Sequence, residues 1–324
     1  MTDRGFDLEG KVIVITGASS GIGRATALRF AAKKEHLVLA SRGEAALKAL
    51  ATECRAKGAR VTVVPTDVSD HAQVKELART AGGRIDVWIN DAGIGAYAPF
   101  TELPVRELKR LVDVNLLGVA YGSRVALKRM LEQDAGVLIN LSSVLGEVPQ
   151  PTAAAYAMTK AAVRSLSEAL RSELRGSGVS VCTVLPEGID TPFYRHAANH
   201  TGREIKATPP VTSADRVARA IVRLADHPWA ETFVGNEGAI LAAWHRITPR
   251  PAEAVMSGIA ATAQFGNDGV TSSSGILFSA TERDDATVSG GFHGTARTVR
   301  RGLLAGAAVV AGIAAFGMLR TRRS

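Results

Sequence analysis

Short runs of apolar residues alternate with longer helical patterns along most of this chain. The runs are rich in β-branched side chains and are predicted as buried strands at Lys11–Thr16, Leu37–Ala40, Val61–Pro65, Asp86–Ile89, Gly136–Leu141, Val179–Leu185 and Glu231–Gly235. Helix-length stretches such as Gly23–Lys33 and Gly43–Lys57 separate them. Strands without a polar face that alternate with helices are typical of a parallel sheet covered on both sides. The pattern predicts an α/β fold, a doubly wound parallel sheet of about seven strands that binds ligands at the carboxyl ends of its strands.

The helical pattern continues after the sixth predicted strand. Residues 213–226 begin with Ser213, a residue type that caps helix N-termini, and then show helical apolar spacing. A weaker helical pattern at Ala239–Gln264 is interrupted by Pro249 and Pro251. We therefore expect residues 1–264 to form one domain.

The composition changes after residue 264. Of the 31 positions in 266–296, 15 are Gly, Ser or Thr, which predicts a linker over 265–296, with a local fold around Ile276–Phe278. Residues 297–324 form a third unit, in which arginines flank the uncharged apolar run 302–319. As a helix this run would be about 27 Å long, close to the roughly 30 Å hydrocarbon thickness of a bilayer. It is predicted as a transmembrane helix, or as a helix buried against another protein or a second copy of the chain.

The net charge of +8 resides in this tail. Residues 295–324 contain six arginines and no acidic residue, and subtracting these six leaves about +2 for the rest of the chain. A nearly neutral body excludes nucleic-acid binding as the main function. The two cysteines, Cys54 and Cys182, cannot build a disulfide framework, and Met1–Gly10 is polar and charged. These features predict a cytoplasmic protein without a secretory signal, associated with a membrane at most through the tail. No metal site is predicted, because His196 and His200 lack a further ligand at suitable spacing.

A glycine-rich turn follows the first predicted strand and leads into a helix. It reads Thr16-Gly17-Ala18-Ser19-Ser20-Gly21-Ile22-Gly23. Glycines permit a tight turn and a close approach to the backbone, and a helix N-terminus offers free N–H groups and a partial positive charge. The turn therefore predicts a pyrophosphate site; the alternative is a plain glycine-rich turn between strand and helix.

The end of the second strand indicates which dinucleotide is bound. An NAD site places Asp or Glu there to bind the ribose 2′-hydroxyl. This chain has Ser41-Arg42-Gly43 instead. A guanidinium pairs with a 2′-phosphate, which a carboxylate would repel. We therefore predict NADP rather than NAD, although Arg42 could also be a solvated surface residue.

Tyr156 and Lys160 lie four residues apart in the predicted helix Ala153–Leu174. This spacing places both side chains on one face, a turn apart. A free tyrosine has a pKa of about 10, and a nearby ammonium group together with oxidised nicotinamide would lower it. Such a tyrosine can protonate a carbonyl oxygen or deprotonate an alcohol. The pair alone is common on surface helices, so the prediction depends on its neighbours.

Polar residues end two successive strands at the same expected edge of the sheet. Asn90-Asp91-Ala92-Gly93 ends one strand, and Asn140-Leu141-Ser142-Ser143 ends the next. A hydroxyl at this edge can orient a reacting oxygen. Asn115 lies in the helix between these strands.

Together these motifs resemble the short-chain dehydrogenase/reductase family, in its single-domain branch with a Rossmann fold. The resemblance covers about residues 8–238 and is carried by Thr16–Gly23, Asn90–Gly93, Asn115, Tyr156–Lys160 and a serine 13 positions before the tyrosine, which selects Ser143 over Ser142. It departs from the family at Asp91, where a second Asn is usual. It departs again at Glu187, which stands between Pro186 and Gly188.

The resemblance implies roles for these residues. Tyr156 would be the acid/base, Ser143 would orient the substrate oxygen, Lys160 would also bind the nicotinamide ribose, and Asn115 would hold a water for proton relay. The implied cofactor contacts are Thr16, Gly17, Ser19, Ser20, Gly21, Ile22, Gly23, Arg42, Asp67, Val68, Asn90, Ala92, Gly93, Tyr156, Lys160, Pro186, Ile189 and Thr191. The family also implies the strand order 3-2-1-4-5-6-7 and a homo-oligomer.

The predicted reaction is NADP-linked hydride transfer between an alcohol and a carbonyl compound. The loop Phe193–Val211 and an apolar stretch with Val144, Leu145, Val148, Pro149 and Pro151 would line the substrate site. These side chains favour a lipophilic substrate such as a steroid, a retinoid or a fatty derivative. The alternative function is a non-catalytic NADP-binding scaffold or redox sensor.

Overall fold

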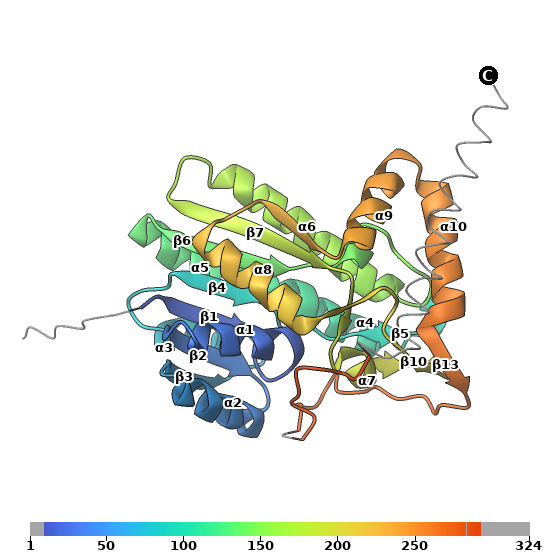
Figure 1. Ribbon diagram of the computed structural model, residues 1–324, viewed down its shortest axis with the longest axis horizontal. Coiled ribbons are helices and arrows are strands. Elements are labelled where there is room, and N and C mark those ends of the chain that lie inside the picture. Colours follow the sequence, from blue (N-terminus) through green and yellow to red (C-terminus); the bar gives the residue numbers. More distant parts are fainter. Residues whose placement is uncertain (1–9, 283, 293–324) are drawn as a thin grey trace, which may run out of the picture.

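The computed structural model describes residues 10–282 and 284–292, and its centre is a seven-stranded sheet (Figure 1). The strands are β1 (Val12–Thr16), β2 (His36–Ser41), β3 (Arg60–Pro65), β4 (Val87–Asn90), β6 (Gly136–Leu141), β7 (Val179–Pro186) and β12 (Glu231–Val234). All neighbouring pairs are parallel, in the order β12-β7-β6-β4-β1-β2-β3. Numbered by themselves, these strands have the predicted order 3-2-1-4-5-6-7, so the doubly wound fold is confirmed.

Helices cover both faces of the sheet. One layer consists of α1 (Gly21–Ala31), α2 (Glu44–Ala56) and α8 (Ala214–Asp226), whose Phe30, Leu50 and Ile221 pack against Ile13 and Ile15 of β1. The other consists of α3 (His71–Thr80), α4 (Val105–Val112), α5 (Gly118–Gln133) and α6 (Ala154–Glu173), and it packs against Val12 and Val14. Successive strand residues point to opposite faces, so an unbroken apolar run supplies both cores.

Helices α8 and α10 (Pro249–Ile259) begin at residues that favour a helix N-terminus. The Ser213 hydroxyl accepts a hydrogen bond from the Arg216 N–H and caps α8 as predicted. The region Ala239–Gln264 contains α9 (Asn236–Ile247), α10 and the turn Ala260–Gln264. The break falls at Thr248, because proline fits the first turn of a helix, where its missing N–H has no intrahelical partner.

Short elements complete the sheet edge that carries the site. These are β5 (Ala96–Tyr97), β8 (Gly188–Asp190), α7 (Phe193–His196), β9 (Ala198–Asn199), β10 (Arg203–Ile205) and β11 (Val211–Ser213). A π-helical turn at Asp113–Leu117 joins α4 to α5, and 3₁₀ turns lie at Phe100–Glu102 and Val144–Gly146.

The register of β1, β4 and β6 places the polar residues near the ends of these strands side by side. Thr16 of β1 pairs with Asn90 of β4, which pairs with Asn140 of β6. The Asn90 Nδ2 donates to Asn140 Oδ1 at 2.8 Å, and Asn140 Nδ2 donates to the Ser167 hydroxyl of α6 at 3.0 Å. Because all of these groups are buried, their mutual hydrogen bonds fix α6 against this end of the sheet.

The described part of the predicted linker packs against the domain. Strand β13 (Phe265–Asp268) pairs antiparallel with β10, and the Leu277 side chain is fully buried. Arg42 and Arg110 both donate to the Leu277 carbonyl oxygen at 2.9 Å. A buried leucine side chain and two half-buried arginines that bond its carbonyl thus hold this segment against the domain, although Gly, Ser and Thr dominate its composition.

The predicted apolar helix at 302–319 lies outside the described residues, as do all six arginines of the tail. Within the part of the chain that the structure does describe, no helix combines the length and the apolar character needed to cross a bilayer.

Candidate functional site

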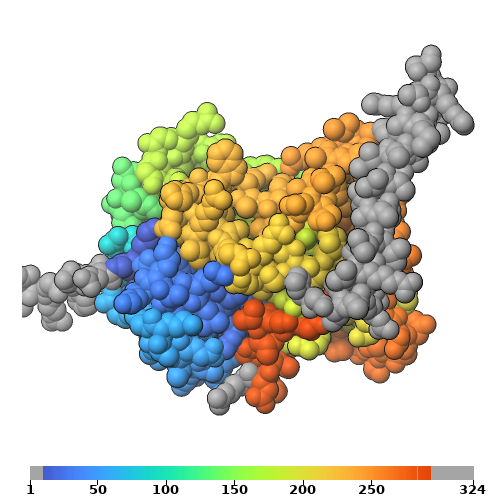
Figure 2. All heavy atoms as spheres, in the orientation of Figure 1, coloured from blue at the N-terminus to red at the C-terminus, as the bar shows by residue number. Residues whose placement is uncertain are grey.

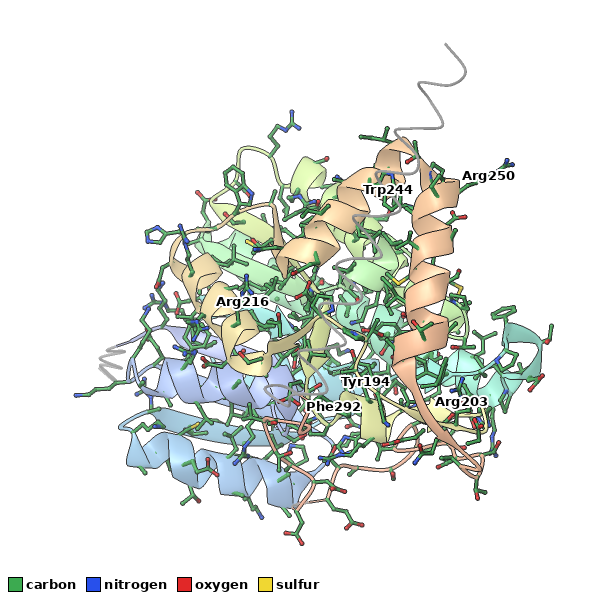
Figure 3. All side chains as sticks on the ribbon, turned by 45° about the vertical axis from the view of Figure 1, so that its right-hand side comes forward. Tyr194, Arg203, Arg216, Trp244, Arg250 and Phe292 are labelled. Carbon is green, nitrogen blue, oxygen red and sulfur yellow. The ribbon has the colours of Figure 1, made fainter. Side chains whose placement is uncertain are left out.

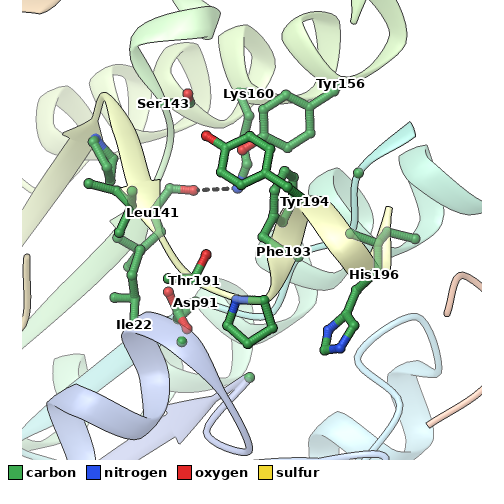
Figure 4. Close-up of a pocket in the computed structure, with 18 of the residues that line it drawn as sticks. Ile22, Asp91, Leu141, Ser143, Tyr156, Lys160, Thr191, Phe193, Tyr194 and His196 are labelled. Atoms are coloured by element: carbon green, nitrogen blue, oxygen red, sulfur yellow. Dashed lines mark hydrogen bonds between the residues drawn. The ribbon is translucent and has the colours of Figure 1, made fainter. Parts of the chain in front are cut away.

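A deep pocket opens at the carboxyl edge of the sheet, between the glycine turn, the ends of β4 and β6, helix α6 and the loop after β7 (Figure 4). Most of the predicted site residues line it, namely Gly17, Ser19, Ser20, Gly21, Ile22, Arg42, Asp67, Val68, Ala92, Gly93, Ser143, Tyr156, Lys160, Pro186, Ile189 and Thr191. The structure therefore brings together residues that lie as far apart in the chain as Gly17 and Thr191.

The other four, Thr16, Gly23, Asn90 and Asn115, lie behind the pocket wall. The Thr16 hydroxyl accepts from the N–H groups of Asp91 and Ala92 at 3.2 and 3.3 Å, which holds the β4 turn against the glycine turn. The Asn115 amide forms two 2.9 Å hydrogen bonds with the backbone of Ile94. These contacts fix the loop after β4, which supplies one wall of the pocket.

The glycine turn is tight because its glycines touch other backbone atoms. Gly17 has φ +71°, and a Cβ there would lie 2.7 Å from the N and Cα of Ala92. A Cβ on Gly23 would overlap the Gly17 carbonyl oxygen. Larger side chains would push the β1 and β4 turns apart. Their absence lets a ligand approach the start of α1, the positive end of that helix.

Tyr156, Lys160 and Ser143 meet on one side of the pocket (Figure 4). The Lys160 Nζ lies 5.7 Å from the centre of the Tyr156 ring and donates to the Leu141 carbonyl at 2.8 Å. The Ser143 hydroxyl hydrogen-bonds the Tyr156 phenol. The Ser142 hydroxyl points elsewhere and donates to the Lys160 carbonyl at 2.8 Å. Of the two candidate serines, Ser143 is the one that contacts the phenol.

Burial has the largest effect on the pKa values of Tyr156 and Lys160. It raises the pKa of the Tyr156 phenol well above its ordinary value, Tyr194 adds to the effect, and the Ser143 hydrogen bond opposes it. Burial also lowers the pKa of Lys160 to about 8, against the attraction of Asp91. In the protein alone the shift of the phenol is thus opposite to the sequence-based expectation, because a buried phenolate is poorly solvated and the lysine ammonium bonds a carbonyl. A protonated phenol is the form that can donate a proton.

Asp91, which lines the pocket, places a carboxyl group beside the glycine turn. Burial raises its pKa to about 7, while the Lys160 charge and a hydrogen bond from the Gly23 N–H oppose that shift. The group is thus neutral below about pH 7 and negative above it. A negative charge here disfavours a pyrophosphate at the same turn.

We expect the affinity for NADH to decrease as the pH rises from 6 to 7.5. The decrease should reach at most about fourfold, since the neutral fraction of a group with a pKa of about 7 falls from roughly 90% to roughly 25% over this range. Asp91→Asn should abolish this dependence. NADH is the suitable probe because it has no titrating 2′-phosphate, and fluorescence titration measures its Kd. An equal pH dependence in Asp91→Asn would assign the effect to another group.

Several pocket residues have no sequence motif that predicts them. Arg110 of α4 does not itself line the pocket, but it binds the lining residue Asp67 at 2.6 Å and the Ser69 hydroxyl at 2.6 Å. Ile276 and Thr281 also line the pocket. Arg42 donates to the carbonyls of Leu277 and Ile276 at 2.9 and 2.8 Å. Chain separations of up to 235 residues leave no local signal for such contacts.

Apolar side chains surround the open side of the pocket. The predicted Val144 and Leu145 are among them, Val148 is buried behind them, and Pro149 and Pro151 do not line the pocket. The lining also includes Tyr97, Phe193, Tyr194, Leu241, Met256 and Ile259. The Phe193 ring lies 5.4 Å from Tyr156 and 5.5 Å from Tyr194, and Tyr194 in turn lies beside Phe292 at 5.6 Å (Figure 3). His196 lines the pocket, whereas His200 bonds the buried Glu107 at 2.8 Å.

Several known proteins are similar to this chain in sequence. The family described as short chain dehydrogenase matches residues 11–201. The oxidoreductase YxnA of Bacillus subtilis is 34% identical over 78% of this chain and 73% of its own length. An oxidoreductase of Staphylococcus aureus strain USA300 is 36% identical over 67% of this chain and 93% of its own length.

Solved structures share the fold at lower identity. A short chain dehydrogenase/reductase from Burkholderia phymatum in complex with NAD is 31% identical, with a TM-score of 0.67 over 75% of this chain and 95% of that one. An alcohol dehydrogenase from Thermococcus sibiricus complexed with 5-hydroxy-NADP is 28% identical, with a TM-score of 0.62 over 70% of this chain and 96% of that one. The chain therefore belongs to the short-chain dehydrogenase/reductase family and is an oxidoreductase that depends on a nicotinamide cofactor.

Proposed function

We propose that this enzyme is an NADP-dependent reductase or dehydrogenase that interconverts a carbonyl compound and an alcohol, with Tyr156 as the acid/base. One observation carries the proposal. The Tyr156 phenol, bonded to Ser143 and close to Lys160, lines the same pocket as the glycine turn. A binding scaffold has no use for a buried tyrosine and lysine beside its cofactor.

The residues of this chain fit a dinucleotide. The pyrophosphate would bind at the start of α1, where the glycine turn carries no hindering side chain, and Arg42 would bind the 2′-phosphate. Asp67 and Val68 would contact the adenine, Lys160 the nicotinamide ribose, and Ile189 and Thr191 the nicotinamide. The cofactor, when bound, supplies or accepts the hydride.

Side chains of the protein would transfer the proton that accompanies the hydride. In the reductive direction Ser143 would hold the carbonyl oxygen while the Tyr156 phenol donates its proton to that oxygen. Burial raises the pKa of this phenol and keeps it protonated at neutral pH, which suits donation. In the oxidative direction the positive charges of Lys160 and of the oxidised cofactor would support the phenolate that accepts the proton.

A lipophilic carbonyl compound or alcohol is the proposed substrate class, because apolar and aromatic side chains form much of the open side of the pocket. The cytoplasmic location, inferred from cysteine usage, and the homo-oligomer, inferred from the family, remain predictions.

The cofactor preference is tested by Arg42→Ala. The wild-type enzyme should bind NADPH at least about tenfold more tightly than NADH, since a charge-assisted pair with a phosphate is worth more than 1 kcal/mol and tenfold corresponds to about 1.4 kcal/mol. Arg42→Ala should bring the ratio of the two Kd values close to one. Fluorescence titrations of both cofactors give the ratio, and NADPH oxidation with apolar aldehydes and ketones in the same cuvette tests the reaction. A ratio that Arg42→Ala leaves unchanged would contradict the assignment, and turnover of sugars alone would contradict the substrate class.

A further inference from the structure

We propose that residues 276–282 and 284–292, here called the strap, are an internal competitor of the dinucleotide and set its apparent affinity. The inference rests on the proposed function, because it concerns the same cofactor groups. In Figure 2 the red atoms of the strap lie directly against the blue atoms of the first elements of the chain. The strap therefore covers the side of the domain that holds the glycine turn.

The strap follows the path that the proposed dinucleotide would take. At the adenosine end, the carbonyls of Ile276 and Leu277 accept both hydrogen bonds of Arg42. Above the glycine turn, the Thr287 carbonyl accepts from the Gly21 N–H at 2.9 Å. At the nicotinamide end, Gly290 packs against the Thr191 backbone. The strap thus meets the adenosine, pyrophosphate and nicotinamide positions in that order.

Each end of the strap is anchored. The Leu277 side chain is fully buried, and its carbonyl also accepts from Arg110. At the other end the Asp190 carboxylate accepts from the Ser289 hydroxyl at 2.6 Å and from the N–H groups of Gly290 and Phe292 at 2.9 and 2.7 Å. Between the ends, Thr281 approaches so closely that a Cβ on Gly43 would lie 2.6 Å from its carbonyl oxygen.

These contacts use donors that a bound dinucleotide needs. The Gly21 N–H can make one good hydrogen bond, and it makes it with Thr287. The Arg42 guanidinium directs two of its N–H groups at strap carbonyls, so a 2′-phosphate that binds through the same two groups would displace these carbonyls. The exchange is favourable because charge-assisted hydrogen bonds to phosphate are stronger than those to neutral carbonyls. The closed strap thus lowers the fraction of molecules that can bind, and the apparent affinity falls by that fraction.

Two substitutions loosen opposite ends of the strap in the full-length chain. Leu277→Ala removes the buried anchor at the adenosine end. Gly290→Ala adds a Cβ that would overlap the Thr191 carbonyl oxygen. Gly83→Ala is the matched control, because its Cβ would meet no atom within 4 Å. We expect both strap variants to bind NADPH and NADH about fivefold more tightly or better, with faster association, and the control to equal the wild type.

Hydrogen exchange of the wild-type enzyme gives a readout that does not depend on affinity. Saturating NADPH should slow exchange in residues 17–23 and speed exchange at Gly290 and Phe292, whose N–H groups bond Asp190 in the closed strap. Protection of both segments would show that the strap clamps the bound cofactor and would overturn the proposal, as would weaker or unchanged binding in both strap variants. If neither dinucleotide protects residues 17–23, the proposed cofactor itself is wrong and the strap proposal fails with it.

Discussion

Replacing Tyr156 by Phe should reduce kcat by about 10² to 10⁴, the usual contribution of a positioned general acid or base. The substitution removes only the hydroxyl. The ring keeps its contact with Phe193, 5.4 Å away, so the shape of the pocket is retained. The lost group is the one that contacts Ser143 and would pass its proton to the substrate oxygen. The Kd of NADPH should change by less than about threefold, because the variant keeps Lys160 and the glycine turn.

Steady-state kinetics with an apolar ketone and a fluorescence titration of NADPH separate these two effects. Tyr121→Phe is the matched control, because Tyr121 lies in α5 and does not line the pocket. Near-normal turnover in Tyr156→Phe would show that another group moves the proton. A wild-type enzyme that binds NADPH tightly but reduces no carbonyl compound would favour the scaffold alternative.

Gly17→Ala should both destabilise the domain and abolish dinucleotide binding. A residue with a Cβ pays about 1–2 kcal/mol for the left-handed conformation at φ +71°. The added Cβ would also lie 2.7 Å from two backbone atoms of Ala92, and such overpacking costs a further 1–3 kcal/mol or so. Relief of the overlap must separate the β1 and β4 turns, which form two walls of the pocket. We expect dinucleotide affinity to fall by at least about a hundredfold, equivalent to about 2.7 kcal/mol.

Gly82→Ala separates the cost of the backbone strain from the cost of the close contact. Gly82 has φ +92°, but a Cβ there would meet no atom within 4 Å, so this variant pays only the conformational strain. Urea unfolding should show the smaller loss of stability in Gly82→Ala, and the NADPH titration should show no loss of binding. If the two variants had equal unfolding free energies and equal affinities, the close contact between Gly17 and Ala92 would have no functional importance.

Local patterns were enough to predict the sheet and the position of the site. The strands Val12–Thr16 and Gly136–Leu141 are apolar except at Thr16 and Asn140 near their carboxyl ends, and burial on both faces of a parallel sheet favours that composition. Tyr156 and Lys160 were predicted to share a helix face because four residues make about one turn. Residues at the ends of parallel strands meet at one edge, which explains why Gly17, Ala92 and Ser143 line one pocket.

The sequence by itself determined which elements form and which reactive side chains they place at the carboxyl edge, because both depend on contacts within a few residues and on burial patterns. Only the tertiary structure decided the course of residues 265–292, the partners of Arg42 and the protonation of Tyr156. The bonds from Arg42 to Ile276 and Leu277 join residues more than 230 positions apart, so neither partner has a local signal for the other. The pKa of Tyr156 depends on how much water the surrounding elements exclude, and the spacing to Lys160 carries no information about that burial.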